Sequence, residues 1–331
     1  MYQSKRPPLQ ELGFHPLQMR LLRGFSAAAG GAMIVCGPMG SGKSLTLGAI
    51  IEDMCRMKRE PATAAIIGGR DFPPEIENAR ITKVANPADT SGSVLERLYA
   101  VRSQIVVFDN FEGLCDFSVV AEMVATGRKV FLAMNSLSAI WVFEQLVKEG
   151  VPRNLLSMSG FISGVVCQRL FPVLCPDCSV PVLDARDWFP DDVFYRVQHV
   201  ADFGADNVRT RGPGCPACGH TGYRGKTVVA EFLMPDVRML RMVAEGKTAD
   251  YYEYWKNSNL LNIDGIGITL LSHAISKMRR GLLDPVDVEA SVGLLTLDMV
   301  MADSALVPTE LGMLIGANGR DAKRPPDIQP F

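Results

Sequence analysis

The chain has 331 residues, of which 47% are hydrophobic, so it can bury a substantial core and form two or three domains. Its 34 basic and 36 acidic residues leave a formal net charge of −2, which argues against a broad basic surface for nucleic acid. No apolar stretch reaches the roughly 18 residues of a membrane span, and no apolar segment follows the first charged residues. We therefore expect a cytoplasmic protein without a transmembrane segment.

Composition divides the chain into five segments. A polar, proline-containing lead-in of extended chain is expected over residues 1–15, and a tail over residues 296–331, the end of which we expect to be disordered. Residues 16–166 alternate apolar runs with helical patterns, which is typical of βαβ units around a mostly parallel sheet. Residues 167–230 are rich in Cys, Pro, Gly and Asp, and residues 231–295 have a helical pattern. The predicted fold class is α/β.

Short apolar runs predict strands in the first half of the chain, over residues 32–36, 64–67, 105–108 and 129–134. A stripe at helical spacing predicts a late helix, with apolar positions at Ile268, Leu271, Ile275 and Met278. Gly281 is placed as its C-terminal cap. Asp284 and Pro285 then have the pattern of an N-cap followed by proline at the first helical position.

The most informative motif follows the first predicted strand. Its residues fit the phosphate-loop pattern of Gly, four residues and Gly-Lys-Ser, namely Gly37, Pro38, Met39, Gly40, Ser41, Gly42, Lys43 and Ser44. Because a strand, a glycine-rich turn and a helix N-terminus follow one another, several backbone N–H groups point at one place. Lys43 can reach the β- and γ-phosphates, and Ser44 can hold Mg²⁺. The motif predicts a nucleotide site.

Polar residues end two later strands. The strand that ends in Asp109 is expected to lie beside the phosphate-loop strand, where the carboxylate would hold Mg²⁺ through water. Asn110 follows; it can hydrogen-bond a water molecule but cannot take its proton. Asn135 ends the last of the four strands. Two interpretations of Asn135 stand side by side, a sensor of the γ-phosphate and a cap for a turn.

Two Cys-x-x-Cys pairs flank residues 179–214. They are Cys175 with Cys178 and Cys215 with Cys218. Each pair presents two thiolates from one tight turn, so that two pairs complete a closed tetrahedral site for Zn²⁺. A closed site predicts a structural metal rather than a catalytic one. The other cysteines are expected to be small buried hydrophobic residues, at positions Cys36, Cys55, Cys115 and Cys167.

Together these motifs resemble the type II secretion and type IV pilus assembly ATPases. Besides the phosphate loop, the resemblance is carried by Gln168-Arg169-Leu170 before the first cysteine pair and by Thr221-Gly222-Tyr223-Arg224-Gly225-Lys226 after the second. Leu12-Gly13-Phe14 and Asp264-Gly265-Ile266 fit the same family pattern. The resemblance covers residues 11–293, and the plasmid-borne thin-pilus branch is the most similar one.

The resemblance implies a RecA-like ATPase core (16–166), a zinc-binding insert (167–230) and a helical C-terminal subdomain (231–295). It also implies a homohexamer at the cytoplasmic face of the inner membrane. There, ATP hydrolysis would drive pilin or pseudopilin assembly together with an inner-membrane platform protein. The family places a further domain before the lead-in, so the chain is expected to be either a fragment or a shortened member.

The family's site residues carry over unevenly. Asp71 and Glu75 occupy its acidic box and are candidates for contacts to Mg²⁺ or water. Asp109-Asn110 stands where the family has Gly-Glu, and Asn135 stands at the histidine-box His. The candidate catalytic residues are therefore Lys43, Asp109, Asn110 and Glu75.

Three functional hypotheses follow. The first is an ATP-dependent motor subunit of a pilus or secretion system, with Mg²⁺ and Zn²⁺ as metals. The second is a ring or regulatory subunit that binds nucleotide without hydrolysing it, because asparagine stands at positions 110 and 135. The third is a zinc-bearing nucleic-acid motor, which the near-neutral charge and the acidic insert disfavour.

Overall fold

The structure is a computed structural model that describes residues 7–27, 30–56, 58–68, 72–85, 91–109, 117–258 and 267–296. Several subjects of the sequence analysis lie outside the described residues: the first six residues of the lead-in, Asp71, Asn110, Cys115, Asp264-Gly265-Ile266 and the tail from residue 297.

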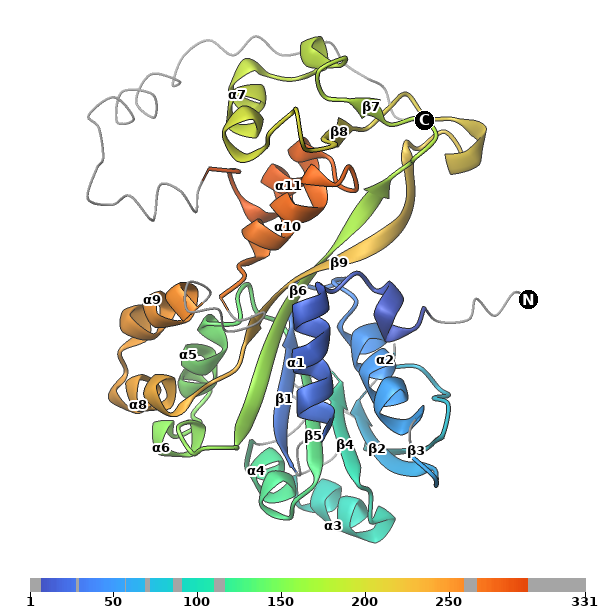
Figure 1. Ribbon diagram of the computed structural model, residues 1–331. Helices are drawn as coiled ribbons and strands as arrows, with labels where there is room; N and C mark the ends of the chain where they lie inside the picture. The colour runs from blue at the N-terminus through green and yellow to red at the C-terminus, as the bar shows by residue number, and fades with distance from the viewer. Residues whose placement is uncertain are drawn as a thin grey trace.

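A seven-stranded sheet in the order β3-β2-β4-β5-β1-β6-β9 forms the centre of the molecule (Figure 1). Its strands are β1 (Gly31–Cys36), β2 (Ala62–Gly68), β3 (Ala79–Ala85), β4 (Ile105–Asp109), β5 (Lys129–Met134), β6 (Ile162–Leu174) and β9 (Tyr223–Leu233). All neighbours are parallel except β9, which is antiparallel to β6. The predicted α/β class with a mainly parallel sheet is confirmed, as are the four predicted strands.

One prediction about strand order is wrong. The strand that ends in Asp109, β4, does not lie beside the phosphate-loop strand, because β5 is inserted between β4 and β1. Strand order is set by the crossover connections, which leave no local pattern in the sequence. The insertion places Asn135, at the end of β5, between the ends of the two strands that carry the phosphate loop and Asp109.

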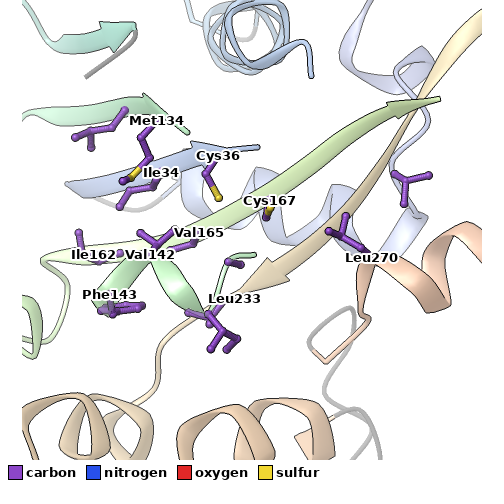
Figure 2. Packing of buried hydrophobic residues seen from close by; sticks show 14 of the residues in the cluster. Ile34, Cys36, Met134, Val142, Phe143, Ile162, Val165, Cys167, Leu233 and Leu270 are labelled. Atoms are coloured by element: carbon purple, nitrogen blue, oxygen red, sulfur yellow. The ribbon is translucent and has the colours of Figure 1, made fainter. Parts of the chain in front are cut away.

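Helices cover both faces of the sheet. One face carries α1 (Pro16–Ala27) and α2 (Lys43–Arg56), and the other carries α3 (Ser91–Val101), α4 (Phe117–Ala125), α5 (Trp141–Lys148) and α6 (Arg153–Leu156). Side chains of a strand alternate between faces, so Met33 and Val35 pack with α2. Ile34 and Cys36 pack into the opposite cluster, shown in Figure 2. Each face therefore has its own buried core.

The strands β6 and β9 continue beyond the sheet as a long two-stranded ribbon (Figure 1). Around its outer end lie η2 (Arg186–Trp188), α7 (Asp191–Val200), η3 (Pro216–Cys218), α11 (Pro285–Val292), and the short strands β7 (Val180–Pro181) and β8 (Arg209–Thr210). Helix α10 (Leu270–Arg279) packs along β9. The remaining helices, α8 (Val237–Glu245) and α9 (Thr248–Ser258), lie near α5 and α6. The cysteine pairs are thus held away from the sheet.

The ribbon also alters two sequence-based expectations. The segment boundary between residues 166 and 167 falls inside β6, and residues 231–233, expected to be helical, are the last residues of β9. Both follow from the antiparallel pairing of β6 with β9, which joins segments far apart in the sequence. No helix in the described ranges combines the length and the apolar character needed to cross a membrane.

The ends of the described chain are closely packed. The lead-in, expected to be extended, contains η1 (Leu9–Glu11), and it buries Leu9, Leu12 and Phe14. The Leu12 carbonyl accepts a hydrogen bond of 2.8 Å from the Val228 N–H, which ties the lead-in to β9. The predicted caps of the late helices are confirmed. Gly281 has φ +73°, and the Asp284 side chain accepts a 2.8 Å bond from the Val286 N–H ahead of α11.

Candidate nucleotide site and metal centre

The phosphate-loop residues form a tight turn between β1 and α2. Gly37, Gly40 and Gly42 have φ angles of +151°, +78° and +83°, which favour glycine. At Gly37 a Cβ atom would lie 2.2 Å from the carbonyl oxygen of Gln168, so a side chain would collide with β6. Met39, at the tip of the turn, is 90% exposed. The loop is therefore a close-packed backbone structure whose tip faces solvent.

Four of the predicted site residues meet at this loop. The Lys43 ammonium donates to the carbonyl oxygens of Gly37 and Pro38, each at 3.0 Å, and to Oδ1 of Asn135 at 2.9 Å. The Ser44 hydroxyl donates to Oδ1 of Asp109 at 2.7 Å. Asp109 is 4% exposed. The inserted strand β5 makes this convergence possible, because it ends between the other two.

This arrangement is suited to a polyphosphate with a divalent cation. An ammonium group at a helix N-terminus attracts phosphate oxygens, which are stronger acceptors for Lys43 than the neutral carbonyls it contacts. The hydroxyl of Ser44 and the carboxylate of Asp109 are oxygen ligands of the kind that Mg²⁺ prefers. The residues present therefore fit a nucleotide bound with magnesium.

Two glutamines that the sequence analysis did not assign to the nucleotide site support it. Nε2 of Gln168 on β6 donates to the Ser41 carbonyl at 2.7 Å, inside the phosphate loop. Nε2 of Gln145 on α5 donates to the Asn135 carbonyl at 3.0 Å. Gln168 stood out only as part of the family pattern, because its bond joins residues 127 positions apart, and Gln145 had no signal in the sequence. They hold the loop and the end of β5 in place.

Glu75 is a predicted catalytic residue that lies outside the phosphate loop and the strand ends that carry Lys43, Asp109 and Asn135. It is exposed on the segment between β2 and β3, next to the buried Phe72 and Ile76. Its role in catalysis stays a prediction.

A groove of about 540 Å³ opens beside the loop. It is lined by Pro38, Asn135, Ser136, Leu137, Trp141, Glu144, Gln145 and Lys148. Trp141 is 56% exposed, so part of the groove wall is apolar and faces solvent. The groove reaches Asn135, the partner of Lys43, from the side of α5.

The four cysteines of the two Cys-x-x-Cys pairs come together at the outer end of the ribbon. Their sulfur atoms all lie within 4.8 Å of one another, and three of the Sγ–Sγ separations are 3.8, 3.9 and 3.8 Å. A tetrahedral site with Zn–S bonds of about 2.3 Å requires sulfurs about 3.8 Å apart. The cluster is therefore compatible with zinc.

Backbone groups support the same cluster. Sγ of Cys218 accepts bonds from the N–H groups of Cys215 at 3.2 Å and Gly222 at 3.3 Å. The Cys215 N–H is the main cause that lowers the pKa of Cys218 to about 6, which favours the thiolate that a metal binds. The Cys175 N–H donates to the Gly222 carbonyl at 2.9 Å. This bond joins the two chain segments that extend from β6 and β9 at the outer end of the ribbon, beside the cluster.

The remaining described cysteines are not part of this site. Cys36, Cys55 and Cys167 are buried, as the sequence predicted. The hydrogen bond with the Cys36 side chain, together with burial, raises the pKa of Cys167, so Cys167 is a neutral thiol within the core.

Comparison with known proteins identifies the family. The family described as "Type II/IV secretion system protein" matches residues 2–280. The chain belongs to this family. Within it, the chain is 28% identical over 214 residues to the type II secretion system ATPase E of Vibrio cholerae, covering 64% of this chain and 40% of that protein. It is 25% identical over 287 residues to the type IV pilus assembly ATPase PilB of Thermus thermophilus, covering 83% of this chain and 31% of that protein.

Solved structures of other proteins have a fold similar to that of this chain. The pilus retraction motor PilT with bound ADP has a TM-score of 0.57 at 16% identity, covering 87% of this chain and 67% of that one. The ATPase DotB of Legionella pneumophila has a TM-score of 0.56 at 13% identity, covering 91% and 66%. The chain spans less than half the length of the two curated relatives.

Proposed function

We propose that the chain is the ATP-binding motor subunit of a type IV pilus assembly or type II secretion system. The observation that carries the proposal is the meeting of Lys43, Ser44, Asp109 and Asn135 at the end of three adjacent strands. Family membership supports it, since the curated relatives are named as ATPases of these two systems.

Each residue has a role in this proposal. Lys43 exchanges its carbonyl acceptors for phosphate oxygens and offsets their charge. Ser44 and Asp109 hold Mg²⁺, which would neutralise charge on the phosphates. The amide of Asn135, which already contacts Lys43, orients toward the terminal phosphate. Asp71 and Glu75 remain candidates for contacts to water or Mg²⁺.

Calorimetry with ATP and Mg²⁺ tests the binding step. Lys43→Ala removes a charge-assisted contact worth about 1.5–3 kcal/mol, so we expect ATP affinity to fall by about 10- to 100-fold. Lys58→Ala is the matched control, because Lys58 lies just beyond the far end of α2 and its ammonium donates to Gln104 at 3.4 Å. Equal affinity in wild type and Lys43→Ala would contradict the proposal.

A second function is a subunit that binds ATP without hydrolysing it. Asn135 favours it, because its amide contacts Lys43 at 2.9 Å in the position where a protonatable side chain would act. Steady-state ATPase assays decide between the two functions. Robust turnover by the wild type removes the second one, whereas turnover gained only in Asn110→Glu supports it.

We further propose three functional units: the RecA-like core, a zinc-bearing lobe and a helical C-terminal part. Zn²⁺ bound by Cys175, Cys178, Cys215 and Cys218 fixes the outer end of the β6–β9 ribbon as a rigid lever or docking surface. The partner would be an inner-membrane platform protein. In this arrangement six copies act as a ring at the cytoplasmic face of the membrane, without binding a specific nucleic acid.

A further inference from the structure

A buried carboxylate on β9 joins the loop after β5 to the first turn of α10. Glu231 is 5% exposed. One carboxylate oxygen, Oε1, accepts hydrogen bonds from the Ser138 hydroxyl at 2.7 Å and the Ala139 N–H at 2.6 Å. The other, Oε2, accepts from the N–H of Leu270, the first residue of α10, at 3.4 Å. Figure 2 shows Leu270 beside the β6–β9 ribbon.

The loop held by Glu231 begins in the nucleotide site. Asn135, which accepts the bond from Lys43, lies three residues before Ser138. The Ser136 hydroxyl donates to the Ser138 carbonyl at 3.1 Å, so the intervening chain is folded on itself and short. If Asn135 moves, Ser138 and Ala139, which donate to Glu231 and lie three and four residues later, are therefore expected to move with it.

Burial makes the three donors of Glu231 interdependent. Desolvation raises the pKa of Glu231, and the bonds from Ser138, Ala139 and Leu270 oppose that effect. A carboxylate that loses its donors in a buried place is strongly destabilised. The N–H of Leu270 has no acceptor within its own helix, and the positive end of the helix dipole favours a carboxylate there. The loop and α10 are therefore expected to move together rather than separately.

Helix α10 leads on to the cysteine cluster. The chain after α10 turns back so that the Leu282 carbonyl accepts a 3.0 Å bond from the Leu174 N–H, the residue before Cys175. The Asp284 side chain, at the start of α11, accepts from the Thr210 hydroxyl at 2.7 Å. A displacement of α10 is thus passed directly to the outer end of the ribbon.

We propose that Glu231 is a positioning residue that transmits the nucleotide state of the Lys43–Asn135 pair to α10 and the outer end of the ribbon. This inference rests on the proposed nucleotide site and adds the route by which that site acts on the rest of the chain. Glu231 touches neither nucleotide nor Mg²⁺ in this account. It acts through the loop of residues 135–139.

Hydrogen–deuterium exchange of the full chain, with and without Mg²⁺ and a non-hydrolysable ATP analogue, tests the proposal. In the wild type we expect nucleotide to change the exchange of the first amides of α10. Glu231→Gln keeps the size of the side chain, but its NH₂ group cannot accept a bond from an N–H or O–H donor. We expect this variant to bind nucleotide, as measured by calorimetry, and to lose the response of α10.

Two further variants make the result decisive. Tyr251→Phe is the matched control: it removes the 2.8 Å bond from the Tyr251 hydroxyl to the carbonyl of Ile140, the residue that follows the loop, and it should keep the response of α10. Ser138→Ala removes one donor only and replaces Glu231→Gln if that variant does not fold. It should weaken the response.

The outcomes that overturn the proposal are distinct from failure of the proposed function. If the wild type binds nucleotide and α10 does not respond, or if the response persists unchanged in Glu231→Gln and Ser138→Ala, the inference is wrong. If the wild type binds no nucleotide, the proposed function fails and the inference fails with it.

Discussion

His273 shows how a single buried side chain can make the stability of this chain depend on pH. Its ring nitrogen Nδ1 lies 3.1 Å from the Ala230 N–H on β9, and the residue is 3% exposed. Burial, assisted by the charge of Lys277, lowers the pKa of His273 to about 3. The ring is therefore neutral in the folded state near neutral pH, whereas the same ring in an unfolded chain takes up a proton near pH 6.5.

The sign of the effect follows from proton uptake. Below pH 6.5 the unfolded chain binds a proton that the folded chain does not, so stability is lost as the pH falls, by up to about 1.4 kcal/mol per pH unit. In His273→Gln this contribution is absent. We expect the free energy of unfolding of the variant, measured in urea from pH 7 to pH 5, to fall less steeply than that of the wild type. Parallel curves would contradict this account of His273.

At the scale of elements, the β6–β9 ribbon depends on the cysteine cluster at its end. Its last pairing, Leu174 with Tyr223, lies next to Cys175 and to the Gly222 carbonyl that Cys175 contacts. Structural zinc contributes on the order of 10 kcal/mol to small domains. Loss of the metal should therefore loosen residues 175–222 and leave the sheet intact.

Cys218→Ser tests this prediction. We expect one zinc per chain in the wild type by elemental analysis, loss of that zinc in Cys218→Ser, and faster proteolysis within residues 175–222. Nucleotide binding should be kept, because the phosphate loop lies at the other end of the ribbon. Cys55→Ala is the control: Cys55 is a buried residue of α2, and this variant should keep one zinc per chain. A wild type without zinc, or a variant with unchanged proteolysis, would refute the prediction.

The sequence predicted those elements whose signal is local. The strands before the phosphate loop and before Asp109 and Asn135 are continuous apolar runs, and both cysteine pairs have a fixed spacing. By contrast, β3 lies at the edge of the sheet and mixes apolar with polar and charged residues, so it contains no continuous apolar run that would predict a strand. The ribbon strand β6 reads as part of a segment rich in Cys, Gly and Pro. Strands β3 and β6 are defined by their pairing with neighbouring strands rather than by a local pattern of apolar residues.

The same limit applies to the candidate site: residues within local motifs could be predicted, and contacts between distant segments could not. Lys43, Ser44 and the four cysteines follow from motifs, and the structure brings the members of each group together. The insertion of β5, and with it the contact from Lys43 to Asn135, depends on strand order. Gln168 and Glu231 act over long distances in sequence, so only the fold reveals them.

For the whole molecule, the position of the nucleotide site suggests how a local event spreads. Gln168 holds the phosphate loop from the middle of β6, and Glu231 holds the loop after β5 from near the end of β9, so both strands of the ribbon contact loops of the site. The outer ends of the same strands carry the cysteine cluster. The ribbon therefore links the nucleotide site to the lobe proposed to contact a partner.

Assembly is the prediction that belongs to this scale. If the chain works as a ring, Mg²⁺ and an ATP analogue should increase the fraction of a species six times the mass of the chain, as measured by mass photometry or light scattering. Lys43→Ala should not assemble in response to nucleotide. A wild type that stays monomeric over the full concentration range, with nucleotide bound, would contradict the ring and leave the nucleotide site in place.

The central claim is that residues 37–44 bind a triphosphate at the start of α2. A crystal structure with Mg²⁺ and a non-hydrolysable ATP analogue tests it most directly. We predict phosphates in contact with the backbone N–H groups of this loop, the Lys43 ammonium moved from the carbonyls of Gly37 and Pro38 to phosphate oxygens, and Mg²⁺ beside Ser44 and Asp109. A nucleotide bound elsewhere, with Lys43 still on those carbonyls, would contradict the account.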